Sequence, residues 1–152
     1  KRIWLGRKSA FGAMGQINDY MCLDGTIPVS SLAEVLRRIG EMSREFGLDV
    51  GNVFHAGDGN MHPLILFNAN KPGDLERCEA FGAEILKLCV EVGGCLTGEH
   101  GVGIEKRDLM VVQFAPQDME AQMRVKDVFD PKWLLNPAKV FPLGVSAGRR
   151  AM

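Results

Sequence analysis

The stretch Val50-Gly-Asn-Val-Phe-His-Ala-Gly-Asp-Gly-Asn-Met-His-Pro-Leu-Ile-Leu-Phe67 decides the fold. Its two apolar ends are typical of strands, and the glycines, Asp and Asn between them are typical of a tight turn. Gly57 and Gly59 can adopt positive φ angles at little cost, which such a turn requires. The stretch therefore predicts a hairpin-like unit that carries His55 and His62 at its mouth.

Helical patterns flank this unit on both sides. Residues 30–46 repeat apolar side chains on one face, and Ser31 followed by Glu34 has the spacing of a capping box. Residues 74–92 form a second amphipathic pattern, with Asp74 as its expected cap. We expect both helices to bury their apolar faces.

The remaining segments complete the predicted order of elements. Residues 19–28 are expected to be extended, whereas residues 104–114 and 116–129 are expected to be helices. Because strands joined by a short turn pair antiparallel, the predicted fold class is α+β, with helices packed on one face of a small sheet. One domain over residues 1–144 holds these elements, and residues 145–152 are expected to form a mobile tail.

The composition is that of a globular domain of 152 residues, because 46% of them are hydrophobic and 24% are charged. The net charge of −1 gives no basic field, so we expect no nucleic-acid partner. No apolar run is long enough for a transmembrane segment. Four cysteines without a CxxC pair predict free thiols in a reducing compartment, the cytoplasm. A chain that begins at Lys1 is expected to be a fragment or a trimmed form of a longer one.

A second glycine-rich stretch, Gly93 to Gly103, carries Glu99 and the third histidine, His100. Two imidazoles and one carboxylate are a common ligand set for a divalent transition metal such as zinc or manganese. The candidate ligands are His55, His62 and Glu99, provided that the fold brings Glu99 close to the turn. The alternative is that both histidines are turn residues hydrogen-bonded to the backbone.

Other polar residues allow two interpretations each. Neighbouring side chains on an extended loop point apart, so Glu99 can bind a metal while His100 faces a substrate as general base. Asp58 either orients a ligand histidine or only shapes the turn. Arg7 either holds a substrate carboxylate through two hydrogen bonds or forms a surface pair with Lys8.

Three motifs follow one another along the chain: His55-Ala-Gly-Asp-Gly-Asn-Met-His62, then Gly93-Gly-Cys-Leu-Thr-Gly-Glu-His-Gly-Val-Gly-Ile-Glu-Lys106, then Phe129-Asp-Pro-Lys-Trp-Leu-Leu-Asn-Pro-Ala-Lys139. Together with Trp4–Lys8 and Asp24–Pro28 they resemble the C-terminal domain of FAD-linked oxidases. That family includes the glycolate oxidase catalytic subunit and the D-lactate and D-2-hydroxyglutarate dehydrogenases. The resemblance covers the chain to about Pro142.

The resemblance implies a ferredoxin-like α+β domain that covers the flavin. It also implies that FAD is held mainly by a separate N-terminal domain, which these residues do not include, so we expect the chain alone to be inactive. The roles it implies are those of metal ligands His55, His62 and Glu99, catalytic base His100, substrate-binding Arg7 and cofactor-binding Asn136.

The implied function is the oxidation of a small D-2-hydroxy acid to the 2-oxo acid by hydride transfer to FAD. A metal-dependent hydrolase and a non-catalytic ferredoxin-like binding module are the alternatives. Cys22-Leu23 stand where the D-2-hydroxyglutarate enzymes carry a lysine, which favours glycolate or D-lactate as the substrate. Ala138 replaces a glycine of the family's closing motif, a mild change if its φ angle is negative.

The same resemblance leads us to expect an electron acceptor or an iron–sulfur partner subunit, and assembly into a homo-oligomer. We expect a cytoplasmic protein that partner subunits could hold at the periphery of the inner membrane.

Overall fold

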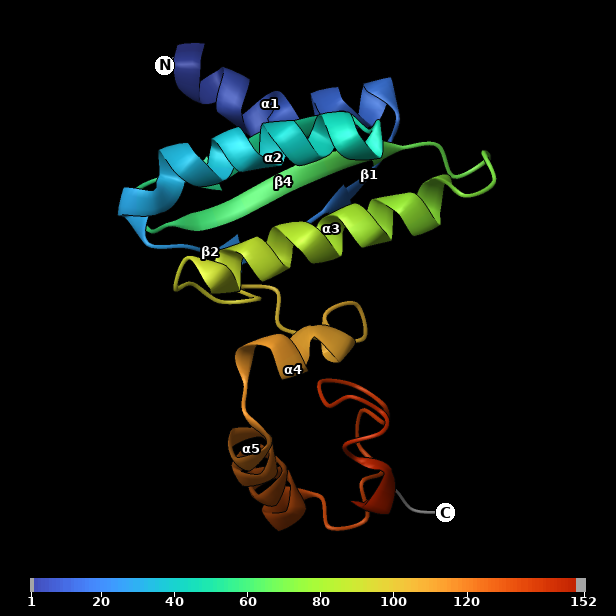
Figure 1. The fold of residues 1–152 in the computed structure, drawn as a ribbon. Helices are drawn as coiled ribbons and strands as arrows, with labels where there is room; N and C mark the ends of the chain where they lie inside the picture. Colours follow the sequence, from blue (N-terminus) through green and yellow to red (C-terminus); the bar gives the residue numbers. More distant parts are fainter. Residues whose placement is uncertain (1, 150–152) are drawn as a thin grey trace. The chain divides into compact units, whose positions relative to one another are not determined.

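The structure, a computed structural model, describes residues 2–149 (Figure 1). The chain divides into two compact units, one reaching to Glu99 and the other starting at His100. The strands found among the described residues all lie in the first unit and form one antiparallel sheet. With helices in both units, the predicted α+β class is confirmed. Within residues 2–149, no helix combines the length and the hydrophobicity that crossing a bilayer requires.

The sheet is organised around strand β4 (Asn60–Phe67), to which every other strand pairs. β3 (Val50–His55) lies along one side of it, and β1 (Asp19–Cys22) and β2 (Gly25–Thr26) lie along the other. The expected extended segment 19–28 is thus two short strands. A bridge from Thr26 to Cys95 completes the βαββαβ order of a ferredoxin-like fold.

The hairpin between β3 and β4 confirms the central prediction. The carbonyl oxygen of His55 accepts hydrogen bonds from the N–H groups of Asp58 and Gly59, at 3.0 and 3.1 Å. Gly59 has a φ angle of 72°, whereas Gly57 does not have a positive φ angle. Only one of the two glycines therefore uses the left-handed region.

Two helices cover one face of the sheet, as predicted. α2 (Leu32–Phe46) and α3 (Asp74–Glu91) lie side by side in front of β4 (Figure 1). They enclose a core that includes Val35, Ile39, Met61, Ile65, Phe81 and Ile85. Leu75, which the amphipathic pattern of α3 would turn inward, is exposed.

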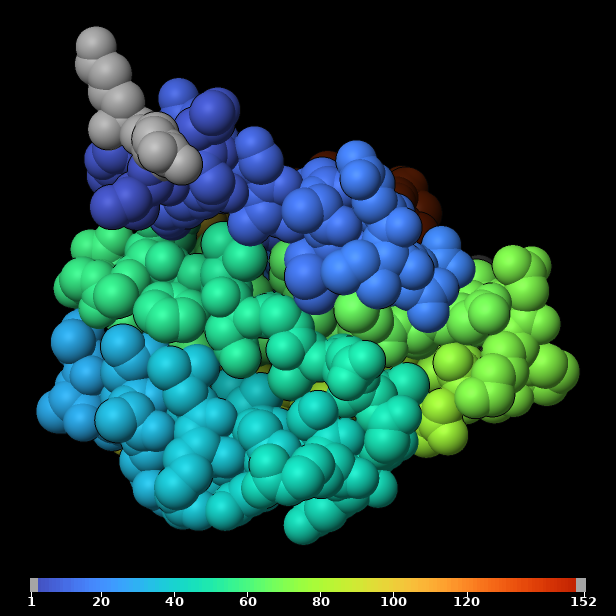
Figure 2. All heavy atoms as spheres, turned by 90° about the horizontal axis from the view of Figure 1, so that it is seen from above, coloured from blue at the N-terminus to red at the C-terminus, as the bar shows by residue number. Residues whose placement is uncertain are grey.

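Helix α1 (Arg2–Ile17), which the sequence left unclassified, lies against the opposite face. Alternation along a strand places Gly51 and Val50 on opposite faces, and Val50 packs against the α2–α3 core. A Cβ atom on Gly51 would lie 2.6 Å from the Met14 side chain, so α1 approaches this face closely. Figure 2 shows the blue atoms of α1 beside the green atoms of the hairpin.

Both predicted helix caps differ from the structure. Ser31 has helical backbone angles and makes no capping hydrogen bond, because a 3-10 turn, η1 (Val29–Ser31), leads directly into α2. Asp74 is the first residue of α3, and its carboxylate accepts the N–H of Asn68 instead of capping the helix end. Gly73 stands at the cap position.

The second unit combines helices with irregular segments. Where one helix was expected over 104–114, the structure has a 3-10 turn, η2 (Arg107–Leu109), followed by α4 (Met110–Gln113). α5 (Pro116–Phe129) confirms the other predicted helix. The φ angle of Ala138 is 61°, so the condition for a mild glycine replacement is not met. A left-handed backbone at a residue with a Cβ atom costs about 1–2 kcal/mol.

The segment expected to be a mobile tail makes contacts in the part that the structure describes. Ser146 is buried, and its hydroxyl donates to the carbonyl of Pro142 at 3.1 Å. η3 (Ala147–Arg149) ends in an arginine that pairs with Glu120 and Asp127 of α5. Residues 150–152 lie outside the described residues, and the single domain over 1–144 stays a prediction.

We predict that Gly59→Ala lowers the free energy of unfolding by about 2–4 kcal/mol. Its Cβ atom would sit in a left-handed backbone and collide with the carbonyl oxygen of Ile27. Gly57→Ala is the matched control, because a Cβ atom there meets no atom within 4 Å and should change stability by less than about 0.5 kcal/mol. Urea denaturation of both variants tests this, and equal losses would contradict it.

Candidate functional site

The polar residues of the hairpin share the face of the sheet that points away from α2 and α3. His55 lies opposite Asn60, and Val53 lies opposite His62. Met61, between Asn60 and His62, points into the core. Because side chains alternate along a strand, Asn60 and His62 project from the other face, as does His55.

The three predicted metal ligands come together at this face. The rings of His55 and His62 have centroids 5.7 Å apart, and Oε2 of Glu99 lies 3.6 Å from Nε2 of His62. One possible ligand atom from each residue lies within 4.8 Å of the other two. Nitrogens bound to one tetrahedral zinc ion lie about 3.4 Å apart, so modest side-chain adjustments suffice for a metal to fit.

The burial of these ligands differs across the site. The side chain of His62 is 8% exposed, whereas that of Glu99 is 59% exposed. The site is therefore buried on the sheet side, at His62, and accessible to solvent on the loop side, at Glu99. A catalytic metal site needs this combination, because some coordination positions must stay open to a substrate.

The orientation of His62 is fixed by the backbone of the neighbouring strand segment. Its Nδ1 atom lies 3.1 Å from the carbonyl oxygen of Leu23. A carbonyl oxygen can only accept, so Nδ1 carries the hydrogen of this bond. In the neutral ring the lone pair is then on Nε2, the nitrogen nearest to Glu99.

Arg7 reaches the site from α1. Its Nη2 atom lies 3.2 Å from Nδ1 of His55. A guanidinium group can only donate, so Nδ1 of His55 is the acceptor in this arrangement. The structure thus places the predicted substrate-binding cation in contact with a predicted metal ligand.

Asp24 is a site residue whose role the sequence did not reveal. It is fully buried, and the strand register that pairs Cys22 with Leu64 and Gly25 with Met61 places it opposite His62. Its carboxylate accepts hydrogen bonds from Oγ1 of Thr97 at 2.8 Å, and from the N–H groups of Gly98 and Glu99 at 2.9 and 3.0 Å. The feature of the sequence that could have indicated this role is an ionisable residue inside a largely apolar segment that is predicted to be extended.

The loop that carries Glu99 also depends on a close approach at Gly98. A Cβ atom there would lie 2.7 Å from Oδ1 of Asn60 and 2.9 Å from Cγ2 of Thr26. The hydrogen bonds to Asp24 hold Glu99 next to the sheet, and the lack of a side chain at Gly98 lets the loop approach that closely.

The other predicted residues lie at the hairpin turn or in the second unit. Asp58 is exposed at the hairpin turn, where its N–H donates to the carbonyl of His55, in keeping with a role in shaping the turn. His100 and Asn136 belong to the second unit, and both are exposed there. Their roles stay predictions.

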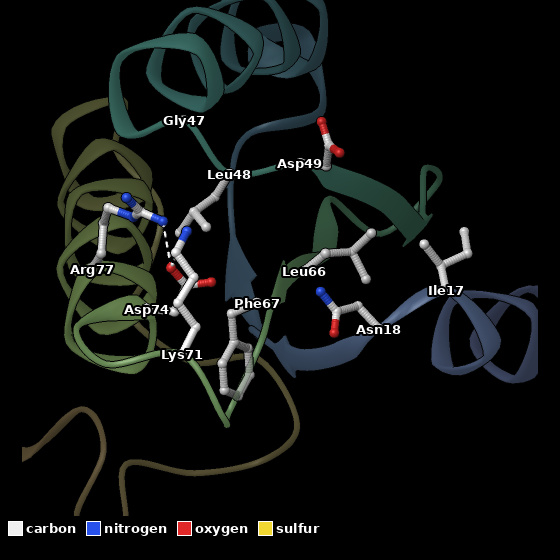
Figure 3. A pocket seen from close by; sticks show the side chains of 10 residues that line it. All are labelled: Ile17, Asn18, Gly47, Leu48, Asp49, Leu66, Phe67, Lys71, Asp74 and Arg77. Carbon is white, nitrogen blue, oxygen red and sulfur yellow. Dashed lines mark hydrogen bonds and ion pairs between the residues drawn. The ribbon is translucent and has the colours of Figure 1, made fainter.

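A hollow at the other end of β4 is not a competing site (Figure 3). Its cations, Lys71 and Arg77, both pair with the carboxylate of Asp74. The N–H of Asn68 holds the pKa of that carboxyl below its ordinary value, and Lys71 and Arg77 act in the same direction against desolvation. This arrangement is a structural ion pair that secures the start of α3.

The family described as "FAD linked oxidases, C-terminal domain" matches residues 1–140. The glycolate oxidase subunit GlcD of Escherichia coli (strain K12) is 55% identical over 142 residues, which are 93% of this chain and 28% of that protein. The subunit of the same name from Bacillus subtilis (strain 168) is 34% identical over 136 residues, 89% of this chain and 29% of that protein.

A D-lactate dehydrogenase of Archaeoglobus fulgidus is 38% identical over 120 residues, 78% of this chain and 26% of that protein. The chain therefore spans less than a third of the length of each of these relatives.

We predict that Asp24→Asn lowers the free energy of unfolding by about 2–4 kcal/mol, because an amide replaces a buried carboxylate that accepts several hydrogen bonds. Zinc affinity should also fall by about 10–100-fold, since Glu99 loses its anchor. Asp19→Asn is the control, because that exposed carboxylate accepts a loop N–H, from Ala69, and no other hydrogen bond from residues 2–149. Urea denaturation and zinc titration measure both effects. A zinc affinity unchanged in Asp24→Asn would contradict the positioning role.

Proposed function

Because the chain belongs to the family of FAD-linked oxidase C-terminal domains, we propose that it forms the metal- and substrate-binding part of an FAD-dependent enzyme. The proposed reaction is the oxidation of a small D-2-hydroxy acid, glycolate or D-lactate, to the 2-oxo acid. The single observation that supports it best is the convergence of His55, His62 and Glu99 on one face of the sheet, with Arg7 beside them.

The donor set fits a divalent transition metal, zinc or manganese. Two imidazole nitrogens and one carboxylate leave coordination positions open for a substrate. Such a metal, when bound, would act as a Lewis acid on the carboxylate and 2-hydroxyl groups of the acid. The roles of the chain's own residues are then to hold these groups in place and to move the proton.

Arg7 is proposed to bind the substrate carboxylate. Its guanidinium presents a planar fork of donors, which matches the two oxygens of a carboxylate. In the structure one of these donors rests on Nδ1 of His55. While Nδ1 accepts this bond, the hydrogen of the neutral ring is on Nε2, so neither ring nitrogen offers a lone pair to a metal. Occupation of the metal site would therefore release Arg7 for the substrate.

His100 is proposed as the base that accepts the proton of the 2-hydroxyl group. It directly follows Glu99 in the chain, and an imidazole can take up a proton near neutral pH. FAD, when bound, supplies the two-electron acceptor for the hydride that leaves C2, so the acid loses two electrons and two protons in total. Asn136, exposed in its own unit, is proposed to approach the flavin from this chain.

The cellular setting follows from the same premise. The two relatives named glycolate oxidase subunit GlcD are described as subunits, and we propose that this chain likewise works with partners. An electron acceptor or an iron–sulfur subunit, a homo-oligomer and a cytoplasmic location at the periphery of the inner membrane complete the proposal.

Elemental analysis of the purified chain tests the metal site directly. We expect about one transition metal per chain after incubation with zinc or manganese, and its loss in His62→Ala and in Glu99→Ala. Asp58→Ala is the matched control, because it removes an exposed carboxylate from the same hairpin and should retain the metal. Equal metal content in all four proteins, or none in any of them, would sink the metal-based proposal.

Arg7→Gln is expected to raise zinc affinity severalfold, because the shorter, neutral side chain takes the guanidinium donor and its positive charge away from the lone pair that the metal needs. Lys8→Gln removes the same charge from the neighbouring exposed position and serves as the control. Competition with a chelator gives both affinities. An equal increase in the two variants would show that only the net charge matters, and not the contact with His55.

A further inference from the structure

We propose that Pro63 is a positioning residue that sets which ring nitrogen of His62 carries the hydrogen. Pro63 lies in the interior of β4, where it is fully buried, opposite Asn52 of β3 on one side and opposite Leu23, between β1 and β2, on the other. Proline is rare at such a position, because it cannot donate to the ladder of a paired strand. The missing donor affects the hydrogen bonding of His62, a proposed metal ligand.

The missing hydrogen bond can be located from the strand register. The N–H of Leu23 donates to the carbonyl oxygen of Pro63 at 3.0 Å. In an antiparallel ladder such a pair exchanges two hydrogen bonds, and the return bond would run from the N–H of residue 63 to the carbonyl of Leu23. Proline has no N–H, so the carbonyl of Leu23 is left without its backbone donor.

Side chains supply the replacement. Nδ1 of His62 lies 3.1 Å from the carbonyl oxygen of Leu23, and Sγ of Cys22 lies 3.5 Å from it. Leu23 is 1% exposed, so its carbonyl needs a partner within the protein. Because thiols are weak donors, His62 is the main hydrogen-bond donor to this carbonyl. Its Nδ1 atom must therefore keep its hydrogen.

The fixed hydrogen determines what the other nitrogen can do. With the hydrogen on Nδ1, the neutral ring has its lone pair on Nε2, which lies 3.6 Å from Oε2 of Glu99. A metal ligand needs that lone pair, and a histidine ligand is commonly oriented by a carbonyl on its other nitrogen. Pro63 thus keeps the lone pair of His62 on Nε2, the form that can bind a metal, already in the metal-free chain. The link to metal affinity rests on the proposed function, whereas the link to the hydrogen position does not.

The test is a long-range ¹H–¹⁵N correlation spectrum of the imidazole nitrogens in the metal-free 152-residue chain at about pH 8, where ordinary histidines are neutral. We expect His62 to carry its hydrogen on Nδ1. In Pro63→Ala, the new backbone N–H takes the Leu23 carbonyl, and His62 should shift towards a mixture with the Nε2–H form. Zinc affinity, measured by chelator competition, should fall about tenfold.

Two further variants keep the test decisive. Pro63→Val restores the same N–H with a residue that favours strands, in case Pro63→Ala does not fold. Cys22→Ala removes the other side-chain donor to Leu23 and should leave the hydrogen of His62 on Nδ1. A hydrogen on Nε2 in the unaltered chain, or on Nδ1 in a folded Pro63 variant, overturns the proposal. A shifted hydrogen in a chain that never binds zinc supports the role of Pro63 and rejects the metal-based function separately.

Discussion

The antiparallel pairing of β4 is the constraint on which the rest of the structure depends. Side chains alternate between the two faces of a strand, so one register assigns Met61 and Ile65 to the α2–α3 core and His62 to the opposite face. A slip of one residue would exchange these faces, turning the histidine towards α2 and α3 and the core side chains away from them. The energy that stabilises the core therefore also determines where the candidate site lies.

Buried polar groups then connect distant segments to that face. The carboxylate of Asp24 is inaccessible to water and is satisfied by donors from Thr97, Gly98 and Glu99, more than 70 residues further along the chain. A buried charge without hydrogen-bond partners is energetically costly, so moving the loop away from Asp24 would destabilise the fold. The need to satisfy the buried carboxylate of Asp24 thereby positions Glu99, a proposed metal ligand.

The hydrogen bonds of the two histidines have opposite directions. His62 donates from Nδ1 to a buried carbonyl, whereas His55 accepts at Nδ1 from the exposed Arg7. One ring is thus held with its other nitrogen prepared for coordination, and the other has its lone pair occupied by a cation. Under the proposed function, His62 provides the fixed part of the site and the His55–Arg7 contact provides the part that changes when ligands bind.

The sequence by itself determined the hairpin, the helices α2, α3 and α5, and the family, because periodicity, turn residues and motifs are properties of neighbouring residues. It also named His55, His62 and Glu99 as a group from their chemistry. Only the tertiary structure decided that Glu99 meets His62, that α1 delivers Arg7 to His55, and that Asp24 anchors the loop. It also showed that Asp74 bonds to Asn68 instead of capping its helix. Each of these depends on which polar groups from distant parts of the chain meet in space, and no local pattern encodes that choice.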